Sequence, residues 1–212
     1  MKRESSIFQL FIGMRPVAET EKKEWGFVPV FLAVTLPLYI LDQITKFWVI
    51  GRFPPPWNDP DPPEKITVIE GYFNIIRVHN QGVAFGFGNG STWAPVVFLI
   101  VPLIALTLIT VGWRKNFFAG AWGRIAAGLL LCGILGNLTD RLVQGSLLEE
   151  MKGAPLWDRL REGYVVDFLD FTIPFFNYRW PSFNVADSCI CVAAALLFFT
   201  GLKADLKQAK GS

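Results

Sequence analysis

The sequence predicts an α-helical integral membrane protein with four transmembrane helices, a small extracytoplasmic β-sheet and a loop or short helix on the outer face. Three observations support this fold class. Hydrophobic residues make up 52% of the 212 residues and charged residues only 18%, whereas about a quarter of a soluble domain is charged. Four apolar stretches each have roughly the 20 residues that a helix needs to cross a bilayer. A β-rich segment lies in one of the two long connections between them.

The apolar stretches are predicted to be helices because backbone groups in lipid must be hydrogen-bonded within the segment itself. Two long connections and one very short one separate them. The predicted spans are approximately residues 27–50, 92–113, 117–138 and 183–202.

Basic residues near the ends of the spans predict the orientation. The short connection carries Arg114 and Lys115, and both tails are rich in lysine or arginine, whereas basic residues are sparser in the connections 51–91 and 139–182. The positive-inside rule therefore places both termini in the cytoplasm and both long connections outside. The predicted organisation is a cytoplasmic tail at 1–24, a membrane domain at 25–203 and a second cytoplasmic tail at 204–212.

The two outer connections have different patterns. The first opens with six prolines between Pro54 and Pro63, which exclude both helix and central strand. The following "KITVIEGYFNIIRVHN" reads as two β-rich runs hinged at residues 70–71, forming a sheet on the outer membrane surface. In the second connection, Leu147, Leu148 and Met151 share one face, which fits a short interfacial helix and a solvated loop equally well.

Composition also narrows the function. The net charge of +2 comes without a basic cluster interleaved with aromatics, so no nucleic-acid partner is expected. All three cysteines lie in apolar segments, which argues against a disulfide framework. His79 is the only histidine and has no cluster of partners nearby in the sequence, so neither a metal nor another cofactor is expected.

Polar residues gather at the predicted outer ends of the spans, whereas ordinary helix-end charges would fall at both ends. Each also has a purely structural explanation: Asp42 and Lys46 have the spacing of a helical ion pair, and Asp187 could complement a helix dipole. The group comprises Asp42, Lys46, Asn80, Asn137, Asp140, Arg141, Asp167, Asp170, Asn184 and Asp187.

Carboxylates are the reactive groups in greatest number at this end. A serine or cysteine nucleophile needs a neighbouring base, and none is obviously placed for one. Two carboxylates held close together share one proton, so that one acts as base and the other as acid. Such a pair can activate water for attack on a peptide bond. Residue patterns alone do not decide whether Asp140, Asp167 or Asp170 is the partner of Asp187.

Read in order, "DQITK", "NQGVAFG", "GNLTDR", "VVDF" and "FNVADSCI" resemble the motifs of lipoprotein signal peptidase (signal peptidase II), a bacterial membrane aspartic protease. The resemblance implies cleavage of the signal peptide of prolipoproteins ahead of a diacylglyceryl-modified cysteine. It assigns the catalytic pair to Asp167 and Asp187. It assigns substrate binding to Asn80, Gly82, Asn137, Arg141 and Asn184, and supporting roles to Asp42, Lys46 and Asp140.

The resemblance further implies a protein of the bacterial inner membrane whose partners are lipid-modified prolipoproteins and membrane lipids, and we expect a monomer. Three features depart from the family pattern: Ile76 stands where threonine is common, the link from Arg141 to Asp167 is longer than usual, and the polar tail 1–24 is an extension outside the match. The alternatives are a small membrane transporter, which would carry polar residues at mid-depth or internal repeats, and a non-enzymatic membrane scaffold.

Overall fold

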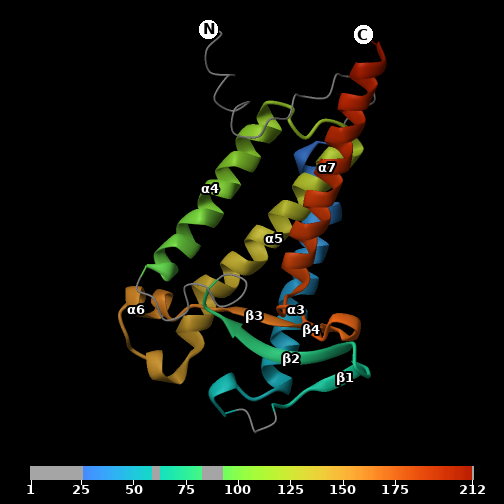
Figure 1. Ribbon diagram of the computed structural model, residues 1–212. Helices are drawn as coiled ribbons and strands as arrows, with labels where there is room; N and C mark the ends of the chain where they lie inside the picture. Colours follow the sequence, from blue (N-terminus) through green and yellow to red (C-terminus); the bar gives the residue numbers. More distant parts are fainter. Residues whose placement is uncertain (1–25, 59–62, 83–92, 212) are drawn as a thin grey trace.

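Four long helices form the body of the molecule in the computed structural model, which describes residues 26–58, 63–82 and 93–211 (Figure 1). All four are long and apolar enough to cross a membrane. The first span joins α2 (Phe27–Val30), a π-helical turn (Phe31–Thr35) and α3 (Leu36–Arg52). The others are α4 (Ala94–Arg114), α5 (Gly120–Leu147) and α7 (Val185–Gly211).

Two of these helices are longer than the apolar pattern predicts. Helix α5 continues to Leu147 instead of ending near residue 138, and α7 continues to Gly211 through the segment expected as a tail. The prediction for α5 was wrong because it ended the helix at its polar residues. Asn137, Asp140 and Arg141 instead lie within the helix, where their side chains are hydrogen-bonded or ion-paired.

A four-stranded antiparallel sheet lies at one end of the bundle, which we call the sheet end (Figure 1). The strands are β1 (Ile66–Ile69), β2 (Phe73–Asn80), β3 (Val165–Ile173) and β4 (Tyr178–Arg179), in the order β1-β2-β3-β4. The predicted hinge between β1 and β2 is confirmed, with Gly71 at a φ of 75°, a conformation that favours glycine. The third strand joins the two long connections into one sheet.

The second connection also contains a short helix, which follows Leu147, Leu148 and Met151 in the chain. Residues Glu149–Met151 form a single 3₁₀ turn, and α6 follows at Leu156–Arg161. A side chain on Gly145 would overlap the carbonyl of Arg159. Because glycine has no Cβ, α6 can therefore approach the end of α5 closely.

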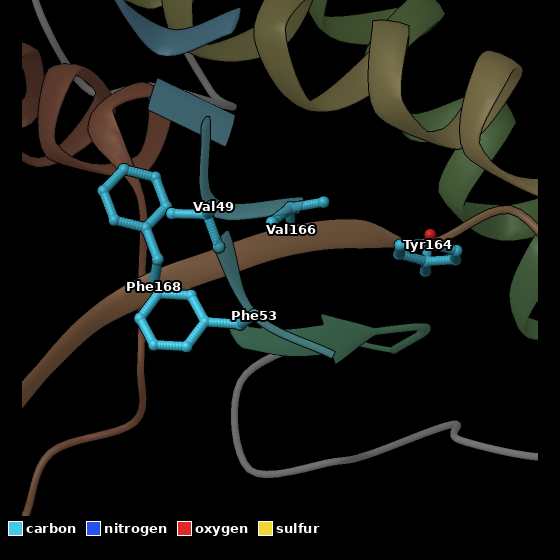
Figure 2. Packing of buried hydrophobic residues seen from close by; sticks show 5 residues of the cluster. All are labelled: Val49, Phe53, Tyr164, Val166 and Phe168. Carbon is cyan, nitrogen blue, oxygen red and sulfur yellow. The ribbon is translucent and has the colours of Figure 1, made fainter. Parts of the chain in front are cut away.

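A hydrophobic cluster fixes the sheet to the end of α3 (Figure 2). Val49 and Phe53 come from that end, and Tyr164, Val166 and Phe168 come from β3 and the residue before it. Burial of each such side chain is worth about 1.5–3 kcal/mol. Because side chains alternate along a strand, packing of Val166 and Phe168 against α3 leaves the residue between them, Asp167, on the opposite face.

Candidate active site

Asp167 is held in the middle of the sheet by its strand neighbour. It lies opposite Val78 in β2 and is only 2% exposed. The side-chain amide of Asn80, two residues further along β2, donates a hydrogen bond of 2.9 Å to Asp167 Oδ2. The Oδ1 atom of Asn80 in turn accepts the backbone N–H of Gly82 at 3.0 Å. The β2–β3 pairing therefore brings Asn80, Gly82 and Asp167 together.

Asp187 lies in the first turn of α7, where it forms a reciprocal cap with Asn184. The backbone N–H of Asp187 donates to Asn184 Oδ1 at 2.9 Å, and the backbone N–H of Asn184 donates to Asp187 Oδ2 at 3.2 Å. This is the geometry of a capping box, built here from asparagine and aspartate. The cap fixes the carboxylate of Asp187 at the point where the helix begins.

The side chain of Asn184 connects the two acids. It is fully buried, and its Nδ2 donates to Asp167 Oδ1 at 2.8 Å. The same side chain caps the amide of Asp187. The backbone N–H of Asn184 donates to Asp187 Oδ2, so both carboxylates contact this one asparagine and the predicted pair lies in a single site.

Burial, together with the nearby charge of Asp187, raises the pKa of Asp167 from 3.8 to about 7. Hydrogen bonds from Asn80 and Asn184 act against this shift, because they stabilise the ionised form. At neutral pH a large fraction of Asp167 therefore carries a proton.

Two further predicted residues line the same place. Asn137 Nδ2 donates to Asp187 Oδ1 at 2.7 Å, and Asn137 Oδ1 accepts from Asn184 at 3.1 Å. Arg141, one turn along α5, donates from Nη2 to the carbonyl of Gly82 at 2.9 Å. Its guanidinium group also lies 4.4 Å from the centre of the Phe98 ring on α4.

Lys46, Asp42 and Asp140 form a buried charged cluster behind the acids, and none is more than 1% exposed. Lys46 Nζ lies 2.9 Å from Asp42 Oδ2, 3.0 Å from Asp140 Oδ2 and 3.1 Å from Asn137 Oδ1. An ammonium group has three N–H donors, and these three oxygens can accept all of them. The helical pairing of Asp42 with Lys46 expected from their spacing is confirmed.

The same two carboxylates hold the backbone beside each acid of the pair. Asp140 Oδ2 accepts the N–H of Val166, which precedes Asp167, at 3.0 Å. Asp42 Oδ1 accepts the N–H of Ala186, which precedes Asp187, at 2.9 Å. The charged cluster therefore fixes both backbone segments that carry the pair.

Asp170 lies apart from these groups although it is only three residues from Asp167. It occupies the other face of β3, where Arg179 Nε donates to Oδ1 at 2.6 Å and Asn74 donates to Oδ2 at 3.3 Å. Its role is to hold β4 and β2 against β3. Asp167 and Asp170 are three residues apart, and residues an odd number apart on a strand point to opposite faces of the sheet.

Sequence reasoning missed Gln43 and the amides of Val166 and Ala186. Gln43 Nε2 donates to Asp42 Oδ2 at 3.1 Å and to the carbonyl of Gly136 at 3.3 Å. Gln43 stands inside the quoted "DQITK", so the motif contained the signal. The backbone amides carry no residue-type signal at all. The glycine-rich residues 83–92 lie outside the described part of the chain.

Comparison with known proteins agrees with this geometry. The sequence profile described as Signal peptidase (SPase) II matches residues 34–203. The chain belongs to the signal peptidase II family. A lipoprotein signal peptidase of Geobacter sulfurreducens is 34% identical over 180 residues, covering 85% of this chain and 96% of that protein. One of Syntrophus aciditrophicus is 36% identical over 169 residues, covering 79% and 88%.

Two solved structures share the fold. One bacterial membrane enzyme has a TM-score of 0.64 and 26% identity, covering 84% of this chain and 90% of its own. A second has a TM-score of 0.62 and 26% identity, covering 86% and 97%. Membership of the family makes this chain a bacterial membrane peptidase, and all the site residues lie within the matched segment.

Proposed function

We propose that this protein is an aspartic endopeptidase that removes the signal peptide from diacylglyceryl-modified prolipoproteins, cutting ahead of the lipidated cysteine. The observation that carries the proposal is the contact of Asp167 and Asp187 with one buried asparagine, Asn184. Family membership supports the substrate class, because the curated relatives named above are lipoprotein signal peptidases.

In the proposed mechanism, Asp167 begins as the protonated acid and Asp187 as the ionised base. Asp187 is assigned as the ionised base because, in addition to its hydrogen bonds from Asn137 and the Asn184 backbone, it lies in the first turn of α7, where the helix dipole favours a negative charge. It removes a proton from water while the water oxygen attacks the scissile carbonyl carbon. Asp167 donates its proton to the developing oxyanion.

Collapse of the tetrahedral intermediate completes the reaction. The C–N bond breaks, the proton taken from water passes from Asp187 to the leaving amine, and Asp167 recovers its proton from the hydroxyl group as the carboxyl product forms. The two acids titrate as a pair throughout. Asn137 and Asn184 hold the pair, while Asn80, Gly82 and Arg141 bind the peptide backbone. Asp42, Lys46 and Asp140 support the pair from behind.

We further infer that the sheet end faces away from the cytoplasm and that both termini are cytoplasmic, as the distribution of basic residues favours. The pair then lies at the outer membrane interface, where a diacylglyceryl group would enter from the lipid. A monomer suffices for this chemistry, since every residue in the proposed mechanism comes from one chain.

Asparagine substitution of each acid tests the proposal. Asp167→Asn and Asp187→Asn should each lower cleavage of a diacylglyceryl-modified prolipoprotein peptide by at least about 10²-fold, the lower range for loss of a general acid or base. Cleavage is measured in detergent by mass spectrometry of the two products. Asp170→Asn is the matched control, because it lies on the same strand but on the other face, and it should keep activity within a few fold.

Near-normal cleavage by Asp167→Asn or Asp187→Asn would exclude the mechanism. Equal losses in all three variants would point to damage to the strand, and the thermal unfolding of each variant identifies that case.

A further inference from the structure

Strands β3 and β4 form an amphipathic hairpin that extends beyond the active site. Thr172 pairs with Arg179 and Ile173 pairs with Tyr178. The turn contains a 3₁₀ segment, Pro174–Phe176, and Asn177 with a φ of 45°. We refer to residues 171–180 as the aromatic hairpin.

One face of the aromatic hairpin is apolar and the other is polar. Residues directly opposite each other in an antiparallel pair point to the same side, and alternate residues along a strand share a side. Phe171 and Ile173 therefore share a face with Tyr178 and with Trp180, whose N–H donates to the carbonyl of Phe171. Thr172 and Arg179 occupy the other face, and Arg179 is ion-paired there with Asp170.

The apolar face and the tip are exposed. At the tip, Phe175 is 89% exposed and Phe176 is 72% exposed, and their rings meet edge to face. Tyr178 and Trp180 are 40% and 51% exposed and are also in edge-to-face contact. Soluble proteins rarely leave a contiguous aromatic patch in water, and such patches indicate an interaction site.

The root of the hairpin is attached close to the start of a membrane span. Only four residues separate Trp180 from Val185, the first residue of α7, which limits their Cα separation to about 18 Å. Phe183 also pairs with Leu169 on β3, which holds this link against the sheet. Figure 1 shows the hairpin projecting sideways from the bundle near the start of α7.

We propose that the aromatic hairpin inserts its tip and apolar face into the interfacial region of the bilayer, with membrane lipid as the occupant of this surface. Tyrosine and tryptophan are enriched at that depth because their rings are apolar while their polar atoms reach water. Phe175 and Phe176 enter more deeply, and the polar face with Arg179 remains toward water. The hairpin thereby fixes the depth of β3, and with it Asp167, relative to the lipid surface.

This proposal concerns membrane contact and does not depend on catalysis, so its test needs no substrate. The variant Phe176→Cys is made in a Cys191→Ala background and carries a nitroxide label in vesicles of phosphatidylethanolamine and phosphatidylglycerol. Cys132 and Cys189 are buried, and Cys191 is exposed on α7. The label's collisions with oxygen, which partitions into lipid, are compared with its collisions with a water-soluble nickel complex.

Two reference positions calibrate the depth. A label on native Cys191 reports a lipid-facing position within a span. A label on Glu149→Cys, also in the Cys191→Ala background, reports a water-facing position, since the Glu149 side chain is 78% exposed in a charged segment. If Phe176→Cys has a lower unfolding temperature than the parent protein, Phe175→Cys is used in its place.

The expected result is that the hairpin label collides more with oxygen than with the nickel complex, as at Cys191 but by a smaller ratio. A ratio equal to that at Glu149→Cys would overturn the proposal, because the tip would then be in water. Protection from both reagents would overturn it as well, since the tip would then be covered by protein.

Discussion

At the end of the bundle far from the sheet, α5 and α7 meet through small apolar residues such as Ala126, Cys132 and Ala193, whereas at the sheet end α3, α5 and α7 meet through buried charges and amides. In the apolar part, contact is mainly close packing: a side chain on Gly128 would overlap Val30 of the first span. This is how helices associate in lipid, where apolar burial gives no driving force. Each dispersion contact is individually weak, so no single pair of atoms fixes the packing.

The charged cluster at the sheet end is different because it fixes positions. Asp42 and Asp140 each hold the amide that precedes one of the two acids. Hydrogen bonds lose strength with small changes in distance and angle, so this part of the bundle sets the geometry of the pair. Packing contacts are thus distributed along the spans, whereas the positions of Asp167 and Asp187, on which the proposed mechanism depends, are fixed by a few atoms around Lys46.

The largest expected effect comes from removing the cation of this cluster. Lys46→Met leaves Asp42 and Asp140 buried without a counter-charge, which should cost about 3–5 kcal/mol of stability. It should also abolish most cleavage, because the two held amides lose their fixed positions. Unfolding in a denaturing detergent titration and peptide cleavage in mild detergent measure the two effects.

Two variants separate the role of charge from the role of packing. Adding Asp140→Asn to Lys46→Met removes one of the uncompensated charges and should recover part of the stability. Lys152→Met is the matched control, because its ion pair with Glu149 is exposed and is worth at most about 1 kcal/mol. Unchanged stability in Lys46→Met would mean that the buried cluster does not hold this end together.

How far the sequence predicts this site depends on which feature is considered. Apolar length was enough to find four spans, and clustering of polar residues at one end was enough to indicate a site. These two patterns did not reveal β3 as a strand. Its sequence, "VVDFLDFTI", pairs with β2, and α4 and α5 separate the two strands in the chain. Pairing between such distant segments leaves no local signal in the sequence. Choosing Asp167 over Asp170 needed the family resemblance, since the deciding feature is which face of β3 each occupies.

The effect of pH on cleavage distinguishes the pair from a purely structural cluster. Because the pKa of Asp167 is raised to about 7, its proton is lost as the pH rises through that value. Cleavage should then fall about tenfold for each further pH unit, as expected when the active form is the protonated one. The measurement is initial cleavage rate between pH 5 and pH 9 in detergent.

Unfolding measured over the same range controls for loss of structure. The folded protein binds more protons at Asp167 than the unfolded chain does between pH 3.8 and about 7, so this group makes stability fall gradually as the pH rises through that window and adds nothing further above it. A cleavage rate that stays constant or rises from pH 7 to pH 9 would contradict the assignment of Asp167 as the acid.

The smallest effect is expected in the apolar part of the bundle, and it completes the comparison. Thr35 is fully buried, and its hydroxyl donates to the carbonyl of Gly128 on α5 at 2.9 Å. Thr35→Val keeps the shape and removes this interhelical hydrogen bond, which in a membrane protein is worth about 0.6 kcal/mol. Cleavage should be unchanged, since this hydrogen bond involves neither the backbone amide of Val166 nor that of Ala186.

The matched control for this substitution is Thr107→Val. The hydroxyl of Thr107 donates only within its own helix, to the carbonyl of Leu103 at 2.8 Å, so the variant makes the same chemical change without breaking a contact between helices. Stability of both variants is measured by the same denaturing detergent titration as for Lys46→Met. If Thr35→Val lowered cleavage or cost as much stability as Lys46→Met, catalytic geometry would depend on the whole length of the spans and not on the charged cluster alone.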